Sequence, residues 1–394
     1  MTAVTNVLIS GTSIAGPALA HRLGEHGIRA TLVEKAPTTR TGGYAVDIRG
    51  AAVDVADRMG ILDRVHSMTA DITEAEMVDA HGRTRARLDP SMLTPSDRSL
   101  EILRGDLVGL LIEAAGQAEY RYGDTITGLE QRADGVRVTF AGGEPETYDL
   151  VVGADGLHSN VRSLAFGPER RYRRFLGSYV SIFTVPNHLG LDQKARLFNT
   201  PGRLLALYQT HRAEDAKALL LHRSGEETEI DRRSAEEQQR YLRTVFSGMG
   251  WETDRVLSDM GEAPDFYFDS VTQIAMDQWS TGRVALLGDA GYSPSPMSGQ
   301  GTTLALVGAY TLADELARHR EPALALAAYE NRMRPYVAAN QAIADPGLAF
   351  LAPQSGLGIA ARNLLLKASP LLSALSKFDT KLSKASEAIE LDPR

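Results

Sequence analysis

Short apolar runs and one amphipathic stretch alternate at the beginning of the chain. Residues 6–10 and 30–33 are apolar enough to predict strands, and residues 14–25 between them have the spacing of a helix, with Gly27 as its stop. Two strands joined through a helix form a βαβ unit, which requires a parallel sheet and a right-handed crossover. The chain is therefore expected to open as the first unit of a nucleotide-binding sheet.

The following segment combines two helices with a polar strand pair. Apolar residues recur at helical spacing in residues 52–66 and 104–118, which predicts the two helices. Alternation in residues 135–140, a turn at 141–143 and a run at 148–152 predict a hairpin in which the second strand returns along the first.

Residues 171–275 have a different pattern. Short alternating runs separated by turn residues are typical of an antiparallel sheet. These runs cover residues 179–185, 195–198, 204–209 and 218–222. Ser234 and Glu237 match a capping box, which predicts one helix inside this region.

The last third returns to the opening pattern, with a buried strand at 283–287, a helix at 304–316 and a mostly helical tail beyond Pro322. We therefore predict an α/β fold with a Rossmann-like nucleotide-binding domain made of discontinuous segments, an inserted antiparallel-sheet substrate domain and a helical C-terminal tail. The predicted boundaries are 1–70, 98–170 and 276–330 for the first domain, 71–97 and 171–275 for the second, and 331–394 for the tail.

Composition and charge narrow the class of protein. A chain with 43% hydrophobic and 23% charged residues is typical of globular proteins. The formal charge of −8 opposes binding to nucleic acid, which we do not expect as a partner. A local basic cluster could instead serve an anionic ligand, although a solvated surface turn explains it more simply. The cluster consists of Arg170, Arg171, Arg173 and Arg174.

The chain contains no cysteine, which excludes disulfides, thiolate metal sites and cysteine nucleophiles. No metal site is expected, and a reducing, cytoplasmic location is compatible with this composition. The apolar segment 356–375 is interrupted by Arg362, Lys367 and Pro370, so we expect packed helices there and no membrane span. The oligomeric state is open, with a monomer slightly favoured.

A glycine turn follows the first strand and opens the first helix. Its sequence is Gly11-Thr12-Ser13-Ile14-Ala15-Gly16, in the context that a phosphate-binding G-x-G-x-x-G turn requires. The first glycine allows the tight turn, the last allows the helix to pack closely on the strand, and free N–H groups at the helix start can face a pyrophosphate. Glu34 closes the second strand, where an acid binds a ribose hydroxyl. An ordinary helix-start turn and a surface glutamate remain the alternative.

Two further turns carry an acidic residue. Gly288-Asp289 ends an apolar strand, where a carboxylate can accept hydrogen bonds from a polyol such as a ribityl chain. A proline- and glycine-rich loop then leads to Thr302 and Thr303 at a helix start, whose partial positive charge would stabilise an anionic reduced flavin ring. Between these turns in sequence lies Asp155-Gly156, followed by Ser159 and Arg162.

The order of these three turns resembles that of the class A flavoprotein monooxygenases, the family of para-hydroxybenzoate hydroxylase. The loop of residues 288–303 looks closest to the branch of tetracycline-inactivating monooxygenases and polyketide hydroxylases. The resemblance covers nearly the whole chain. It implies an FAD-dependent hydroxylase that uses NADPH or NADH and O2 to oxidise a small aromatic substrate.

The resemblance also implies the residues that contact FAD. The glycine turn matches the pyrophosphate site and Glu34, with the adjacent Lys35, the adenosine end. The remaining implied contacts are Asp47, Arg104, Asp155, Gly288, Asp289, Pro296, Gly299, Gly301, Thr302 and Thr303. Three positions depart from the family: Ser13 replaces a glycine, Tyr292 a histidine and Thr303 an asparagine. The last two positions flank the flavin ring in the family, so these replacements could alter hydrogen bonding there.

In this family a flavin hydroperoxide transfers oxygen to an electron-rich ring or enol, so the protein must hold the substrate and exclude water. No catalytic residue is assigned. His188, His211 or His222 could assist deprotonation of the substrate, though surface or packing roles are more common. Candidate lining residues, which could equally be sheet core, are Phe198, Tyr208, Phe266, Tyr267 and Phe268.

The substrate class we expect is a phenolic or enolic, polycyclic compound such as a polyketide or an antibiotic, in biosynthesis or in resistance. Two alternatives stay open. One is a flavin-dependent reductase or oxidase on the same fold, and the other is a flavin-binding homologue without turnover.

Overall fold

The computed structural model describes residues 4–39, 44–70, 72–88, 98–210, 214–368 and 384–392. Its first sheet has six strands in the order β17-β18-β11-β1-β2-β7. The strands are β1 (Asn6–Ser10), β2 (Arg29–Glu34), β7 (Glu119–Tyr122), β11 (Leu150–Gly153), β17 (Ser280–Thr281) and β18 (Val284–Leu286). All neighbours are parallel except β17 and β18. The predicted βαβ opening and the discontinuous origin of this sheet are thus confirmed.

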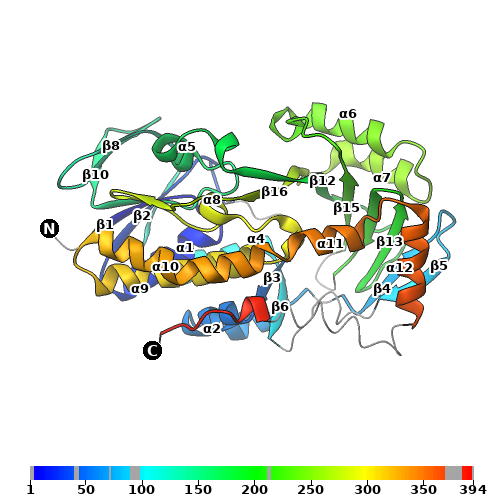
Figure 1. Ribbon diagram of the computed structural model, residues 1–394, viewed down its shortest axis with the longest axis horizontal. Coiled ribbons are helices and arrows are strands. Elements are labelled where there is room, and N and C mark those ends of the chain that lie inside the picture. The colour runs from blue at the N-terminus through cyan, green and yellow to red at the C-terminus, as the bar shows by residue number, and fades with distance from the viewer. Residues whose placement is uncertain are drawn as a thin grey trace.

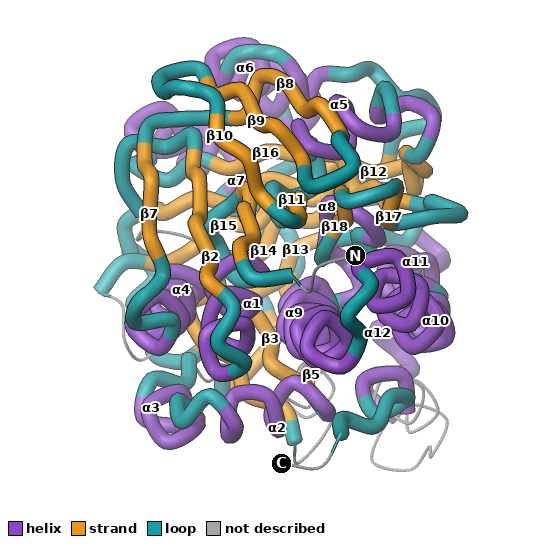
Figure 2. Tube along the Cα trace, turned by 90° about the vertical axis from the view of Figure 1, so that its left-hand side faces the viewer, coloured by secondary structure: helices purple, strands orange, loops and turns teal. Residues whose placement is uncertain are grey.

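Helices cover one side of this sheet, and Figure 2 shows them in a row beneath it. They are α1 (Ala15–Glu25), α4 (Arg104–Ala114), α9 (Gly301–Arg318) and α10 (Pro322–Gln341). Helix α1 contacts both α4 and α9, and α10 contacts α9. Because both faces of a parallel sheet are covered, its strands are continuous apolar runs. Helix α10 is unbroken, so the boundary expected after residue 330 falls inside it.

A three-stranded sheet made of β8 (Ile126–Gln131), β9 (Val136–Phe140) and β10 (Glu146–Tyr148) lies on the other side. The predicted second strand at 148–152 is wrong, because the chain divides it between two sheets. Strand β10 pairs with β9, and β11 enters the six-stranded sheet. Asp149 stands at the crossing, where its Oδ2 accepts hydrogen bonds from the Thr5 and Asn6 amides at 2.8 and 2.9 Å. This carboxylate joins the crossing to the start of β1.

The second large sheet has seven strands in the order β16-β12-β15-β14-β13-β4-β5. They are β4 (Glu74–Val78), β5 (Thr84–Leu88), β12 (Arg173–Val185), β13 (Lys194–Thr200), β14 (Arg203–Tyr208), β15 (Ala216–Arg223) and β16 (Tyr267–Ile274). The pairs are antiparallel as predicted, apart from β13 and β4. Figure 1 shows β12 and β16 extending from the region of the first sheet into the second.

Helices cover the second sheet on both faces. Helices α6 (Ala235–Phe246) and α7 (Thr253–Asp259) pack on one face, and α11 (Ala344–Leu351) and α12 (Gly356–Ala368) lie toward the other. The predicted capping box is present at the start of α6, where Ser234 accepts from the Glu237 amide and Glu237 accepts from the Ser234 amide. No helix within the described ranges is long and apolar enough to cross a membrane.

Smaller elements connect these layers. They are α2 (Ala51–Arg58), α3 (Leu62–Ser67), α5 (Asn160–Phe166), α8 (Asp289–Tyr292), the strand pair β3 (Ala45–Arg49) and β6 (Ser99–Leu103), and the short 3-10 turns η2 (Glu169–Arg171), η3 (Ile230–Arg232), η4 (Met260–Glu262) and η5 (Pro296–Ser298). The helix expected at 52–66 is two helices, because Gly60 adopts a positive φ of 69° between them. The helix expected to reach residue 118 ends before Gly116, which also has a positive φ.

Candidate functional site

The glycine turn of residues 11–16 and the Asp155-Gly156 turn meet at the carboxyl ends of β1 and β11. The parallel register places Ser10 beside Gly153, so Gly11 lies against Ala154 and Asp155. Gly11 has a φ of 109°, and a Cβ there would lie 2.4 Å from the Ala154 carbonyl oxygen. The position therefore requires glycine both for its backbone conformation and for the close approach of the two turns.

The start of α1 joins the glycine turn of residues 11–16 to the Gly288-Asp289 turn. A Cβ on Gly16 would lie 2.0 Å from the Gly11 carbonyl oxygen, so this glycine lets the helix begin directly behind the turn. The Cβ of Ala15 lies 3.5 Å from where a Cβ on Gly288 would stand. The N-cap Ile14 makes no side-chain capping bond. Amide groups at an uncapped helix start attract anions.

Two of the expected contacts bond directly to each other. Arg104 begins α4, and its Nη2 donates to Ser13 Oγ at 2.7 Å. The Arg104 amide donates to the carbonyl of Tyr44, the residue before β3, which ties this helix start to β3. The serine that replaces the family's glycine therefore anchors an arginine at the phosphate turn.

Glu34 accepts hydrogen bonds from Thr12 of the glycine turn. Its Oε2 accepts from the Thr12 amide and hydroxyl, each at 3.2 Å, and its Oε1 accepts from the Ala36 amide at 3.0 Å. Lys35 is exposed and lines a hollow of about 480 Å³ together with residues 36–39. The expected adenosine end of the site thus borders this open hollow.

Asp155 is bound by the amino end of α5. Its Oδ2 accepts from the Asn160 and Val161 amides at 2.9 and 3.0 Å, and its Oδ1 accepts from the Ser159 hydroxyl at 2.5 Å. Burial nevertheless raises the pKa of this carboxyl. The next residue, Gly156, has a positive φ of 80° and open space where a Cβ would stand. Asp155 therefore fixes the D-G turn, and Gly156 is the part of that turn that faces free space.

The remaining residues expected to contact FAD lie at or near the Gly288-Asp289 turn. Asp289 follows Gly288, and its Oδ1 lies 3.7 Å from where a Cβ on Gly301 would stand. A Cβ on Gly299 would lie 3.1 Å from Asp47 Oδ2, so β3 also borders this loop. Pro296 lies in η5, and Thr302 with Thr303 forms the first turn of α9. The three turns, β3 and the start of α4 therefore converge on one region.

Tyr292 and Thr303 are the two departures from the family that were expected at the flavin ring, and both form hydrogen bonds within the protein. Tyr292 is fully buried, and its hydroxyl lies 2.8 Å from the Tyr329 hydroxyl, which donates to the Leu286 carbonyl. Its ring packs 4.6 Å from that of Trp279. Thr303 Oγ1 accepts from the Arg49 amide at 3.2 Å. The Tyr292 phenol is thus engaged in the core under α9 and α10, and an effect of this residue on hydrogen bonding at the flavin stays a prediction.

Three tyrosines border a recess between the turns and the second sheet. Burial raises the pKa of Tyr44, Tyr208 and Tyr267, yet each side chain keeps part of its accessible surface. The same holds for Asp289. The charge of Tyr44 acts on the pKa of both Tyr208 and Tyr267, so the three side chains lie near one another around this accessible space. The rings of Tyr44 and Tyr267 lie 5.6 Å apart.

The other candidates from the second sheet lie elsewhere. Phe198, Phe266 and Phe268 belong to the core under α6 and α7. His222 is buried in the same core, bonds to Tyr241 at 2.9 Å, and has its pKa lowered to about 4 by burial. His188 pairs with Glu252 at 2.8 Å. His211 lies outside the described residues. Tyr208 and Tyr267 are thus the lining candidates that reach the recess.

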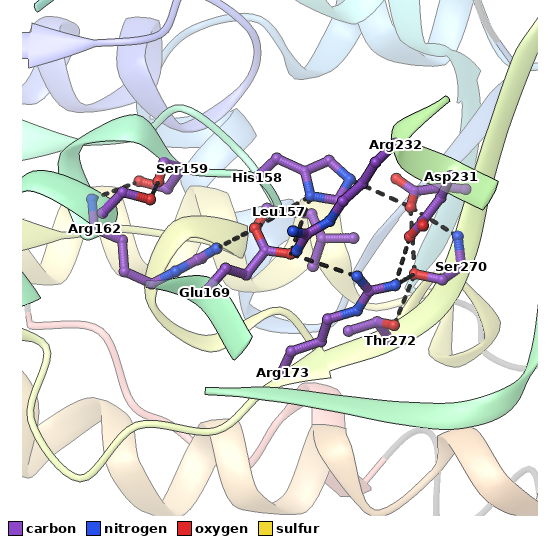
Figure 3. A network of polar contacts seen from close by, with 12 residues as sticks. Leu157, His158, Ser159, Arg162, Glu169, Arg173, Asp231, Arg232, Ser270 and Thr272 are labelled. Carbon is purple, nitrogen blue, oxygen red and sulfur yellow. Dashed lines mark hydrogen bonds and ion pairs between the residues drawn. The ribbon is translucent and has the colours of Figure 1, made fainter. Parts of the chain in front are cut away.

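Within the basic cluster, Arg170, Arg171 and Arg174 are exposed as in a solvated turn, whereas Arg173 is buried among carboxylates. Arg173 is 4% exposed and pairs with Asp231 at 2.5 Å and Glu227 at 2.6 Å. Figure 3 shows this pair beside Glu169, Arg162, Arg232 and His158. Charged residues that are buried in this way must be paired. His158 lies two residues after Gly156 of the D-G turn, where no motif marked it in the sequence.

His158, Asp231 and Asp269 bring ligand-type atoms within 4.8 Å of one another. A cation there would have to compete with Arg173, which already holds Asp231, and with the positive charge of His158. Hydrogen bonds that His158 donates to the carboxylates of Asp269 and Glu169 raise its pKa to about 9. The cluster is therefore arranged as a network of ion pairs.

Sequence and structure comparisons find flavoproteins that are similar to this chain. The family model described as "FAD binding domain" matches residues 4–344. A flavin-dependent monooxygenase from an unknown prokaryotic organism is 44% identical over 338 residues, covering 85% of this chain and 87% of the relative. The crystal structure of the tetracycline destructase Tet(55) has a TM-score of 0.86 at 40% identity, covering 99% of each chain. That of Tet(51) has a TM-score of 0.87 at 34% identity, covering 99% and 100%.

Proposed function

The chain belongs to the FAD binding domain family and is an FAD-dependent monooxygenase, and on that premise we propose that it hydroxylates a phenolic or enolic, polycyclic small molecule with NADPH or NADH and O2. The observation that carries this proposal is the convergence of three glycine turns around an uncapped helix start. Tetracycline destructases at 34% and 40% identity support the substrate class.

The residues of this region fit the chemistry of FAD. At the pyrophosphate, the start of α1 offers free amides and Arg104 a fixed positive charge, while Ser13 positions that arginine. At the adenosine end, Lys35 lines the open hollow, and Glu34 precedes it in the chain. The glycine positions allow the cofactor to approach the backbone, since side chains there would meet neighbouring turns. Gly11, Ile14, Ala15 and Gly16 would hold the pyrophosphate.

The other end of the region fits the flavin and its ribityl chain. Asp289 would accept hydrogen bonds from the ribityl hydroxyls. The ring would lie against Gly299 and Gly301, at the uncapped start of α9, whose dipole favours negative charge on the reduced ring. The further residues that would line this end are Asp47, Asp155, Gly288, Pro296, Thr302 and Thr303.

Bound FAD, once reduced by NAD(P)H, supplies activated oxygen for insertion of one atom into the substrate. This chain has to hold the reacting carbon near the flavin and keep bulk water away. The recess bordered by Tyr44, Tyr208 and Tyr267 would lie between the loop of residues 288–303 and the second sheet. A flat polycyclic substrate would stack there against aromatic rings.

A panel of compounds tests the proposal. Purified holoprotein is mixed with NADPH or NADH in air and with tetracycline, emodin or resorcinol, and product mass is measured along with NAD(P)H consumption. A product heavier by one oxygen atom is expected for at least one polycyclic compound. Yellow protein that oxidises NADPH without any oxygenated product would indicate an oxidase or reductase. Yellow protein that never oxidises NADPH or NADH would indicate a non-catalytic homologue.

A further inference from the structure

One row of side chains crosses three adjacent strands of the second sheet. Thr184 on β12 pairs with Lys217 on β15, and Lys217 pairs with Tyr208 on β14. Residues that are directly opposite each other in a sheet point to the same face. This is also the face of Tyr267, because Tyr267 pairs with Ile182, which stands two residues before Thr184 on β12. The row therefore lies on the face of the second sheet that borders the recess.

The row stands at one end of the recess. The carboxyl end of β16 contacts the loop of residues 288–303, where Gln273 Nε2 donates to the Pro294 carbonyl at 3.3 Å. Tyr267 is at the opposite, amino end of β16, and the row lies two residues beyond it, about 7 Å further from that loop along the sheet. Its side chains can therefore contact the part of a polycyclic substrate that is farther from the loop.

An ion pair fixes the centre of this row. Lys217 Nζ donates to Asp265 Oδ2 at 2.5 Å and to Thr184 Oγ1 at 2.8 Å, and Asp265 Oδ1 accepts from the Thr184 amide at 2.8 Å. Burial raises the pKa of the Asp265 carboxyl, but the hydrogen bonds from Lys217 and Thr184 outweigh burial and lower that pKa. The side chains of Lys217 and Asp265 are only 16% and 17% exposed. Apolar residues at these positions would avoid the desolvation that this pair costs.

Two hydrogen-bond donors of the row remain available to a ligand. An ammonium group has three N–H donors, and Lys217 uses two of them for Thr184 and Asp265. The Tyr208 hydroxyl has no hydrogen-bond partner among the residues that the structure describes, and its side chain is half-buried. Burial raises the pKa of this phenol, so it keeps its proton and can donate it. Two donors thus stand side by side at the end of the recess.

We propose that Lys217 and Tyr208 bind two neighbouring oxygen atoms of the substrate, a carbonyl beside a hydroxyl or enol. The inference rests on the proposed function. Lys217 donates its remaining N–H to the more negative oxygen, and the Tyr208 hydroxyl donates to the other. Cross-strand neighbours stand about 5 Å apart at their Cβ atoms, which suits oxygens on adjacent positions of one ring system. A polycyclic compound without such an oxygen pair leaves both donors unpaired and binds less tightly.

Two isomers of equal mass test this recognition. The hydroxyl of 1-hydroxyanthraquinone stands beside a carbonyl, and that of 2-hydroxyanthraquinone does not. Binding of each isomer to the FAD-loaded full chain is titrated through the change in flavin absorption, without NADPH and at a pH where both phenols are neutral. The parent is expected to bind 1-hydroxyanthraquinone about tenfold more tightly than its isomer.

Substitutions in the row should remove this preference. Lys217→Met should weaken binding of 1-hydroxyanthraquinone about tenfold to a hundredfold and Tyr208→Phe about threefold to tenfold, while binding of the other isomer changes less than about twofold. Lys217→Arg should recover part of the loss. Lys194→Met is the matched control, because Lys194 also pairs with a glutamate on this sheet but points to the other face.

Kinetics separate recognition from a structural role. With tetracycline or emodin, whichever is oxygenated, Lys217→Met should raise KM and leave kcat within about twofold, because the contact is the same before and during the reaction. FAD affinity should stay within about twofold in each variant, since the row lies outside the glycine turns. Should Lys217→Met fail to fold, Tyr208→Phe and Lys217→Arg keep the test decisive.

A parent that binds the two isomers equally, or binds neither, would overturn the inference. Variants that weaken both isomers to the same extent would assign the row a structural role and overturn it as well. The titrations require no turnover. A parent that prefers 1-hydroxyanthraquinone but gives no oxygenated product with any compound would therefore contradict the proposed function and leave the recognition of the oxygen pair supported.

Discussion

Gly16 offers the sharpest test of how the phosphate turn is built. In Gly16→Ala the new Cβ would lie 2.0 Å from the Gly11 carbonyl oxygen and 3.3 Å from Ile9 Cγ2. The first of these atoms belongs to the backbone, so it cannot move aside as a flexible side chain would. Helix α1 must therefore shift away from the turn that it adjoins.

The cost follows from the packing. Inserting a methyl group into a close-packed region costs about 1–3 kcal/mol, and contact with a backbone atom places this case at the upper end. Alanine in a helix gains about 0.5–1 kcal/mol over glycine, which offsets part of the cost. A shift that removes about 1.4 kcal/mol from the binding of FAD weakens its Kd tenfold. We expect a net loss of about 2 kcal/mol in stability and at least that tenfold loss in affinity.

Gly24→Ala is the matched control, because it lies in the same helix with no atom within 4 Å of the added Cβ. It should stabilise the chain by about 0.5–1 kcal/mol and leave FAD binding unchanged. Urea unfolding of the apoprotein and flavin fluorescence titration measure the two quantities. If Gly16→Ala binds FAD like the parent and unfolds at the same urea concentration as Gly24→Ala, the close approach of α1 to the turn is not required.

Three further predictions concern other groups. Tyr292→Phe removes the hydroxyl bonded to Tyr329 and should cost about 1 kcal/mol of stability without moving the flavin absorption bands; a shifted spectrum at unchanged stability would place the phenol at the flavin. Because the pKa of His158 is raised to about 9, its ion pairs should stabilise the chain fully below about pH 6.5, with the gain lost as pH rises through 9. Given its exposure, that gain should be about 1 kcal/mol, and a parent whose urea midpoint has the same pH dependence as His158→Gln would contradict it. Asp289→Ala should weaken FAD binding about tenfold to a hundredfold by titration, whereas an unchanged Kd would remove Asp289 from the site.

Much of the fold and of the candidate site could be read from local patterns. The apolar runs at β1, β2 and β18, the glycine turn between β1 and α1, and the capping box of α6 are all confirmed. Each is specified by neighbouring residues, since backbone conformation and helix starts depend on a few positions along the chain. The convergence of the three turns also follows from sequence order, because parallel strands end at the same edge of a sheet.

Contacts between distant segments could not be read in this way. The run expected at 148–152 divides between two sheets at Asp149, whose partners are the amides of residues 5 and 6. Tyr292 faces Tyr329 because α10 closes over it, and His158 meets Asp269 because β16 passes the D-G turn. Periodicity along a chain states which side of an element is apolar, but not which distant group that side will meet. Those partners depend on how the layers pack, and they determine which polar groups are left to face the recess.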